Sequence, residues 1–291
     1  MVTGDHASWG YTTSTGLGFT HEEIVDAHFE ACAPQYRTAF ELAGIQPGWH
    51  VLDAGCGTGA FLPWLAEAVG PSGRTAAIDL AEENASLAAA RMDAWRARHD
   101  TGEVEVRQGD ILRLPYADAT FDAVWCANTT QYLNDEELAR ALRELRRVVR
   151  PGGVVAVKDL DASLITVRPG DPFRFMDHFR RAAETPGYAR QLLRTRDLWR
   201  WLAGAGLVSV RQQTMLIEHH APLRPAVLRF YGLACARLAE QAVRMGCGEA
   251  WRTLLDPDGE TNPLRDPYGY VSEGNTVALG TVPERGGSGH S

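Results

Sequence analysis

The middle of the chain alternates short apolar runs with stretches of helical periodicity, and this alternation limits the possible folds more than any other feature of the sequence. The runs have the length of β-strands, are rich in Val, Ile and Ala, and end at a small or acidic residue. Such strands suit a parallel sheet that helices cover on both faces, as in repeated βαβ units. We predict these strands at residues 50–54, 74–80, 103–108, 121–127 and 154–159.

One segment carries complete signals for the start and the end of a helix. Asn134 can cap a helix, Glu137 follows three residues later, and acidic residues fill the first turn. Arginines fill the last turn, and Pro151-Gly152-Gly153 then stops the helix. The sequence therefore predicts a helix between the fourth and fifth strands.

Two further helices are predicted outside this regular core. Asp171 and Pro172 have the residue types of an N-cap and a first helical position, which predicts an inserted helix. Its apolar face would hold Phe173, Met176 and Phe179. A second helix is predicted within residues 21–43, where these residues recur at every fourth position: Ile24, His28, Cys32, Tyr36 and Phe40.

The sheet pattern resumes late in the chain, with strands predicted at residues 208–219 and 276–281. Together these elements predict an α/β fold with a seven-stranded, mostly parallel sheet, an antiparallel last strand, and helical insertions that form a lid. We expect this division of the chain: an N-terminal arm and helix (1–44), the core (45–161), an inserted helical lid (162–194), the core continued (195–220), a second helical insertion (221–270), the final strand (271–283) and a disordered tail (284–291).

Composition excludes several classes of function. With 29 Lys and Arg against 37 Asp and Glu, the formal charge is −8, which makes a nucleic-acid partner unfavourable. The five cysteines are scattered and form no C-x-x-C pair, which argues against disulfides and a zinc site. The sequence has no membrane-length apolar stretch and no signal peptide, so we expect a cytoplasmic protein, monomeric or homodimeric, that acts on a small molecule.

The segment from Val51 to Gly59 is rich in glycine and runs from a predicted strand into a helix. Glycines let the backbone approach a ligand closely, and the helix N-terminus favours negative or electron-rich groups. The bare pattern also fits the G-x-G-x-x-A fingerprint of dinucleotide-binding proteins. Two later acids favour a ligand that contains adenosine. Asp79 can accept hydrogen bonds from ribose hydroxyls, and Asp110 can accept one from an adenine amino group.

In these residues the chain resembles the class I S-adenosylmethionine-dependent methyltransferases, over about residues 45–161 and the last two strands. The phrase from Gly109 to Asp122 is similar to the small-molecule branch, which includes ubiquinone, menaquinone and natural-product methyltransferases. The resemblance implies a Rossmann-like fold and S-adenosylmethionine as the cofactor. It also implies these cofactor-binding residues: Asp53, Gly55, Cys56, Gly57, Gly59, Asp79, Leu80, Asp110, Ile111 and Asn128.

A methyltransferase must hold its acceptor in line with the methyl group, exclude water, and remove a proton where one has to leave. The candidates for that proton transfer are Tyr11, Tyr132, Asp161 and His178. Aromatic residues outside the core predict an apolar pocket that fits a flat heteroaromatic molecule. Together with the resemblance, they favour an indole-like or phenolic natural product as the acceptor. They are Trp9, Tyr11, Phe19, Phe173, Phe175, Phe179, Tyr188 and Tyr231, and Met176 joins them.

Two other functions stay open on the sequence alone, namely an NAD-dependent oxidoreductase and a non-catalytic module that binds S-adenosylmethionine. A nucleic-acid methyltransferase is disfavoured, because Asn128 is followed by Thr-Thr-Gln instead of the Pro-Pro-Tyr expected for exocyclic amines. We predict no metal site. The pair His219-His220 lies on a predicted strand, where adjacent side chains point to opposite faces.

Overall fold

A computed structural model describes residues 22–284, which form two compact units. The core unit comprises residues 38–159, 194–214 and 276–284, and the insert unit comprises residues 22–37, 160–193 and 215–275. In the described part of the chain, none of the helices is both long and apolar enough to cross a membrane.

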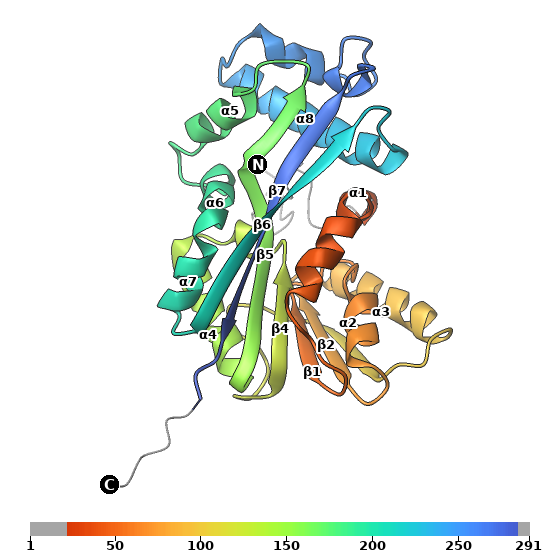
Figure 1. Ribbon diagram of the computed structural model, residues 1–291, viewed down its shortest axis with the longest axis vertical. Helices are drawn as coiled ribbons and strands as arrows, with labels where there is room; N and C mark the ends of the chain where they lie inside the picture. The colour runs from red at the N-terminus through yellow and green to blue at the C-terminus, as the bar shows by residue number, and fades with distance from the viewer. Residues whose placement is uncertain (1–21, 285–291) are drawn as a thin grey trace, which may run out of the picture. The chain divides into compact units, whose positions relative to one another are not determined.

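The strands form a seven-stranded sheet in the order β3-β2-β1-β4-β5-β7-β6. The pairs β1–β2, β1–β4, β2–β3 and β4–β5 are parallel, and Figure 1 shows β7 running opposite to β5. This confirms the predicted α/β fold with a mostly parallel sheet. The strands are β1 (His50–Ala54), β2 (Arg74–Asp79), β3 (Glu103–Gln108), β4 (Phe121–Ala127), β5 (Val149–Arg168), β6 (Val208–His220) and β7 (Tyr270–Thr281).

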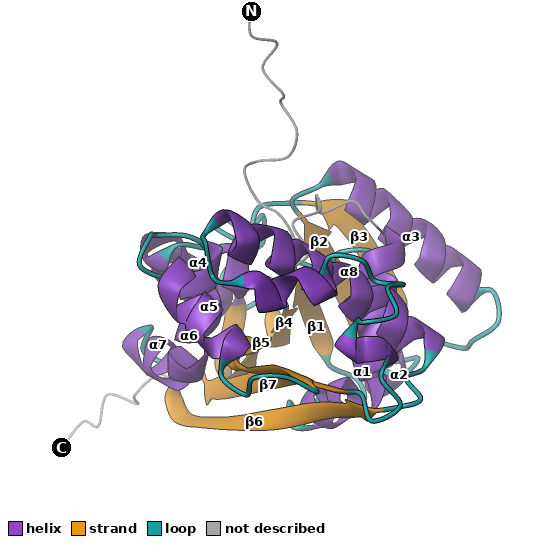
Figure 2. Ribbon diagram, turned by 90° about the horizontal axis from the view of Figure 1, so that it is seen from above, coloured by secondary structure: helices purple, strands orange, loops and turns teal. Residues whose placement is uncertain are grey.

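Helices cover both faces of the sheet in the core unit. Figure 2 shows α2 and α3 on one side of the strands, and α4 and α7 on the other. The insert unit contains α5, α6 and α8, together with most of α1. The helices are α1 (Glu22–Glu41), α2 (Leu62–Val69), α3 (Glu82–Arg96), α4 (Asp135–Val148), α5 (Arg174–Ala182), α6 (Tyr188–Arg194), α7 (Leu198–Gly204) and α8 (Pro225–Arg244).

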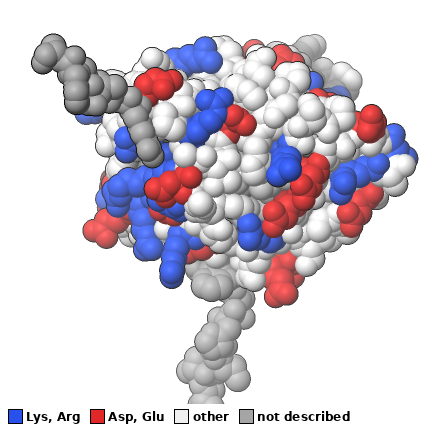
Figure 3. All heavy atoms as spheres, turned by 90° about the horizontal axis from the view of Figure 1, so that it is seen from below, with Lys and Arg blue, Asp and Glu red and all other residues white. Residues whose placement is uncertain are grey.

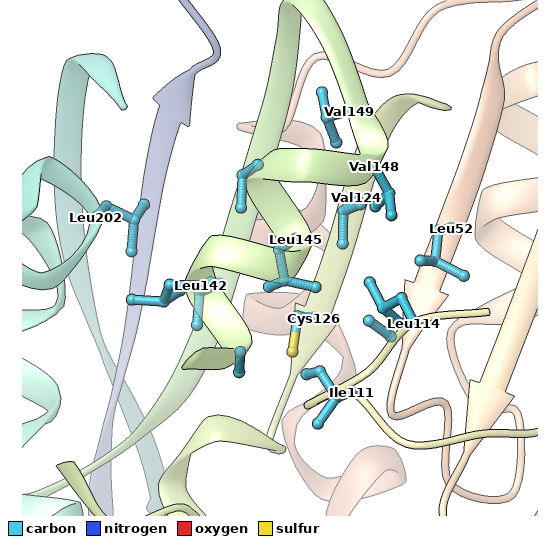
Figure 4. Close-up of a cluster of buried hydrophobic side chains, with 14 of the residues drawn as sticks. Leu52, Ile111, Leu114, Val124, Cys126, Leu142, Leu145, Val148, Val149 and Leu202 are labelled. Carbon is cyan, nitrogen blue, oxygen red and sulfur yellow. The ribbon is translucent and has the colours of Figure 1, made fainter. Parts of the chain in front are cut away.

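The main hydrophobic cluster of the core unit lies between α4 and the sheet (Figure 4). Leu142 and Leu145 of α4 are fully buried, as are Leu52 of β1 and Cys126 of β4. Burial of a leucine side chain contributes about 1.5–3 kcal/mol to folding. The short central strands are buried along almost their whole length, which explains their continuous apolar sequence.

The surface mixes charges of both signs. On the face drawn in Figure 3, basic side chains stand beside acidic ones. Ion pairs in the core unit show the same pattern, since Arg147 contacts both Asp118 and Glu144, and Arg150 contacts Asp122.

Strand β5 is longer than the sequence predicted. It begins at Val149, five residues before the predicted start, and it continues to Arg168. Its register against β4 shifts after the pairing of Phe121 with Val149, so the Pro151–Gly153 segment bulges from the strand. A bulge accommodates the extra residues without ending the pairing.

The inserted helix α5 begins later than predicted. The carboxylate of Asp171 accepts from the Phe173 amide at 2.9 Å, which forms a turn before the helix instead of its N-cap. The predicted apolar face was correct for Phe179, which is buried, and wrong for Phe173, which is 66% exposed. The buried face carries Phe175, His178 and Phe179, which have an equally valid helical spacing.

The predicted start of α4 is confirmed. The Asn134 side chain accepts from the Glu137 amide at 3.0 Å, and the Glu137 carboxylate accepts from the Asn134 amide at 2.9 Å. This reciprocal capping box satisfies two amides that would otherwise have no partner within the helix.

We expect Asn134→Ala to lower the free energy of unfolding by about 1 kcal/mol, because the cap depends on the side chain of this residue. Urea denaturation followed by circular dichroism measures the change. Arg143→Ala, on the same helix, is the matched control and should change it by less than about 0.5 kcal/mol. Equal effects of the two substitutions would contradict a stabilising role for the cap.

Candidate functional site

A glycine-rich turn joins the end of β1 to α2. Gly55 has a φ of +83°, and a Cβ at this position would overlap the side chain of Thr129. The Thr129 hydroxyl donates to the Gly55 carbonyl oxygen at 3.1 Å, so the turn packs tightly against the segment after β4. Gly59 lies against α3, where a Cβ would come within 3.0 Å of Ala88 Cβ.

Gly57, at the centre of this turn, has different surroundings. Its φ is +53°, but a Cβ there would meet no heavy atom of the described residues within 4 Å. The open space beside Gly57 therefore lets a ligand approach the backbone closely. Its amide donates to Asp79 Oδ2 at 2.8 Å, which ties the turn to the end of β2.

Asp79 ends β2 and accepts three hydrogen bonds. Besides the Gly57 amide, the donors are the Ala81 amide at 3.0 Å and the Asn84 side chain at 3.0 Å, both to Oδ1. Burial raises the pKa of Asp79, and these hydrogen bonds oppose the rise. Two carboxylate oxygens offer about four acceptor sites, so Asp79 can still accept from a ligand hydroxyl.

Asp53 lies at the end of β1 and is 1% exposed. Burial raises its pKa to about 8, and the charge of Asp79 adds to this shift. Among the described residues, Asp53 Oδ2 has no hydrogen-bond partner. A buried oxygen atom without a hydrogen-bond partner suits a ligand that brings a hydrogen-bond donor or a positive charge.

Cys56, between these groups, is 7% exposed, and burial raises the pKa of its thiol well above the ordinary value. The thiol therefore stays protonated at neutral pH and is a packing residue. Leu80 is half-buried, and its carbonyl oxygen accepts from the Gln108 side chain at 3.0 Å.

The predicted adenine-contacting pair lies after β3. Asp110 is exposed, and its Oδ1 accepts from the Leu112 amide at 2.8 Å. The side chain of Ile111 is 9% exposed and belongs to the hydrophobic cluster beneath α4. Contact of either residue with a cofactor remains a prediction.

A group of polar residues lies where the end of β4 meets the middle of β5, and sequence analysis found it only in part. Asn128 has a φ of +54°, and its side-chain oxygen accepts from Lys158 Nζ at 2.7 Å. Asp159 accepts from the Thr129 amide at 3.1 Å and from the Thr130 hydroxyl. Burial raises the pKa of Asp159 to about 6.

Lys158 and Asp159 were not predicted as site residues, although the sequence contained a signal. Lys158 is the only lysine of the chain, and it interrupts an apolar run that predicts a buried strand. Its side chain is fully buried. A charged residue in such a run needs a specific partner, which here is Asn128.

The four predicted proton acceptors have different environments. Tyr11 lies outside the described residues, and Tyr132 is half-buried in a turn after β4. Asp161 is buried and accepts from both the amide and the hydroxyl of Ser163, at 2.9 and 2.5 Å. His178 is 1% exposed, its Nε2 lies 3.2 Å from Gln241 Oε1, and burial lowers its pKa. Their catalytic role remains a prediction.

The insert unit contains a cavity of about 560 Å³. Of the predicted aromatic residues, Phe179, Tyr188 and Tyr231 line it, and Phe230 of α8 joins them. Phe175 is buried beside Trp251 instead, while Trp9, Tyr11 and Phe19 lie outside the described residues. The remaining walls of the cavity include aliphatic residues and the carboxylate of Glu273 of β7.

This chain is similar to known proteins in both sequence and fold. Residues 51–153 match the family model of a methyltransferase domain. The chain is 33% identical over 184 residues to the probable methyltransferase ltbC of Aspergillus luteorubrus, an alignment that covers 60% of this chain and 62% of that protein. The chain thus spans about three fifths of the length of this relative.

Two further similarities extend over more of the chain. It is 29% identical over 249 residues to methyltransferase GfsG of Streptomyces halstedii, covering 85% of this chain and 81% of that protein. In structure it is similar to a putative methyltransferase of Bacillus halodurans, with a TM-score of 0.51 and 17% identity, over 85% of this chain and 98% of the other. At that identity the structural similarity supports the fold alone.

The raised pKa of Asp53 predicts a pH-dependent stability. Between its ordinary pKa of 3.8 and the folded-state value of about 8, the folded chain holds a proton that the unfolded chain has released. The contribution of Asp53 to the free energy of unfolding therefore decreases as pH rises through this range, by at most about 1.4 kcal/mol per pH unit.

We expect Asp53→Asn to remove this decrease, so that the difference in unfolding free energy between wild type and variant changes with pH between 4 and 8. Urea denaturation at several pH values measures it. Asp100→Asn, at an exposed position after α3, is the control and should leave the pH dependence unchanged. A constant difference between wild type and Asp53→Asn across this range would show that the pKa of Asp53 is not raised.

Proposed function

We propose that this chain, which belongs to the class I S-adenosylmethionine-dependent methyltransferases, transfers a methyl group to a small aromatic or heteroaromatic natural product. The observation that carries the proposal is the space beside Gly57, whose amide donates to the carboxylate of Asp79. When bound, S-adenosylmethionine supplies a methyl group that is already activated on a sulfonium sulfur.

The residues of the core unit fit this cofactor chemically. Asp79 can accept from a ribose hydroxyl, because its carboxylate has acceptor capacity beyond its three present donors. Asp53 keeps a buried acceptor atom without a partner among the described residues, and a cationic group beside it would favour its ionised form. Asp110, Ile111 and Asn128 complete the set of residues that we propose for cofactor binding.

The cavity of the insert unit supports the proposed class of acceptor. Its volume of about 560 Å³ lies in the range of small-molecule sites. Four aromatic rings line it, from Phe179, Tyr188, Phe230 and Tyr231, and flat rings pack well against such side chains. The indole-like or phenolic natural product is proposed on this ground.

We expect isothermal titration to show binding of S-adenosylmethionine and S-adenosylhomocysteine, with affinity about 10- to 150-fold lower in Asp79→Ala. This range corresponds to the loss of a charge-assisted hydrogen bond worth about 1.5–3 kcal/mol. Asp100→Ala, at an exposed site, is the matched control and should bind like the wild type.

The same titration separates the alternative functions. Binding of NAD without binding of S-adenosylhomocysteine would overturn the proposal in favour of an oxidoreductase. Binding of S-adenosylmethionine without methyl transfer to any indole or phenol in a radiolabel screen would leave a non-catalytic module as the better description.

A second experiment tests the acceptor cavity. Ala234 of α8 lines the cavity, so Ala234→Phe should reduce methyl transfer to an acceptor found in that screen at least about tenfold. Cofactor affinity should stay unchanged, since the proposed cofactor residues belong to the core unit. Leu233→Phe is the control, because Leu233 is half-buried on the same helix and does not line the cavity. Full activity of Ala234→Phe would place the acceptor elsewhere.

A further inference from the structure

Three side chains that commonly bind metals come together in the insert unit. His28 and Cys32 lie one turn apart on α1, and Glu273 lies on β7. Glu273 Oε1 is 2.9 Å from His28 Nε2 and 3.6 Å from Cys32 Sγ. All three ligand atoms lie within 4.8 Å of one another.

The group is buried as well as compact. Cys32 is fully buried, Glu273 is 2% exposed, and the side chain of His28 is 14% exposed. A carboxylate at this depth needs a cation or a strong set of hydrogen bonds, because burial without compensation costs several kcal/mol. His28 supplies a positive charge only when its imidazole is protonated.

Two of the three separations can be compared with those of a tetrahedral metal site. Metal–nitrogen and metal–oxygen bonds of about 2.0 Å and a metal–sulfur bond of about 2.3 Å place tetrahedral ligand atoms about 3.3–3.5 Å apart. The sulfur–oxygen separation of 3.6 Å already matches this value. The nitrogen–oxygen separation of 2.9 Å is slightly short, and a small rotation of the Glu273 side chain would correct it.

We propose that His28, Cys32 and Glu273 bind one Zn²⁺ ion. Imidazole, thiolate and carboxylate are the ligands that zinc takes in proteins, and the thiolate favours zinc over magnesium or calcium. Charge supports this choice, because one thiolate and one carboxylate balance the two positive charges of the ion. On binding, the proton of the Cys32 thiol is released to solvent.

Neighbouring groups also contact two of the proposed ligand atoms, and the contact to His28 Nε2 would give way when an ion binds there. The Asn275 side chain donates to Glu273 Oε1 at 2.7 Å, and the Tyr36 hydroxyl lies 3.3 Å from His28 Nε2. The ring of His28 stacks on Phe230, with centroids 3.8 Å apart.

One of the three proposed ligands also lines the cavity of the insert unit, so we infer that the fourth position of the ion would face this cavity. Glu273 lines the cavity, as does Phe230, on which His28 stacks. Three protein ligands with an open fourth position are the arrangement of catalytic zinc sites, whereas structural sites have four protein ligands. An ion here would bind water or an oxygen or nitrogen atom of a molecule in the cavity.

The proposal does not depend on cofactor binding, since every residue proposed to bind S-adenosylmethionine belongs to the core unit. Its test is a titration of the purified full chain, stripped with a chelator, with Co²⁺ as a spectroscopic substitute for Zn²⁺. We expect one equivalent of Co²⁺ to produce a thiolate-to-cobalt charge-transfer band and the strong visible bands of tetrahedral cobalt. Zn²⁺ should displace the cobalt and abolish both.

Cys32→Ser should remove the charge-transfer band. Glu273→Gln should weaken cobalt binding at least about 100-fold, which is more than is usual when a group that only hydrogen-bonds to a metal ligand is removed. Cys235→Ser is the matched control, because Cys235 is also buried and lines the cavity but lies outside the cluster. It should keep both bands. Circular dichroism checks that each variant is folded.

Two outcomes would overturn the zinc site. The first is that the stripped wild type shows no charge-transfer band with Co²⁺. The second is a band that persists in Cys32→Ser. In either case the three side chains form only a buried hydrogen-bond network.

Discussion

The hydrogen bond from the Gly57 amide to the Asp79 carboxylate joins the ends of two neighbouring strands, and the rest of the core site depends on it. It places the glycine turn beside Asp79. Burial raises the pKa of Asp53, and the charge of Asp79 adds to this shift. Only glycine fits at Gly55, because Thr129 occupies the space of a side chain. The core site thus combines a turn of glycines, in which no side chain blocks the backbone, with carboxylates that are costly to bury.

Local patterns carried most of the information about the core unit. Each central strand is buried on both faces, so its sequence is apolar throughout and its position could be predicted to within one or two residues. The start of α4 was predictable because its cap joins residues three apart, Asn134 and Glu137. The glycine turn was predictable because closely spaced glycines between a strand and a helix favour a ligand-binding backbone.

Features that depend on distant residues or on a choice between similar local structures were missed. The carboxylate of Asp171 can cap a helix or close a short turn, and the same residues fit both until packing selects one. His28 and Glu273 are 245 residues apart, so no spacing pattern could connect them. The helical repeat through His28, Cys32 and Tyr36 predicted that these side chains share a face, but not what that face meets.

The buried lysine in the middle of β5 has a practical consequence. Lys158 holds the only side-chain amine of the chain, and its side chain is fully buried with its nitrogen bonded to Asn128. Acylating reagents react with accessible, unprotonated amines, so the folded core shields this one from them. Acylation at Lys158, measured by mass spectrometry of the peptide that contains it, therefore reports local opening of β5 around this residue rather than surface exposure. Lys158 can thus serve as a chemical probe of local unfolding in the core unit.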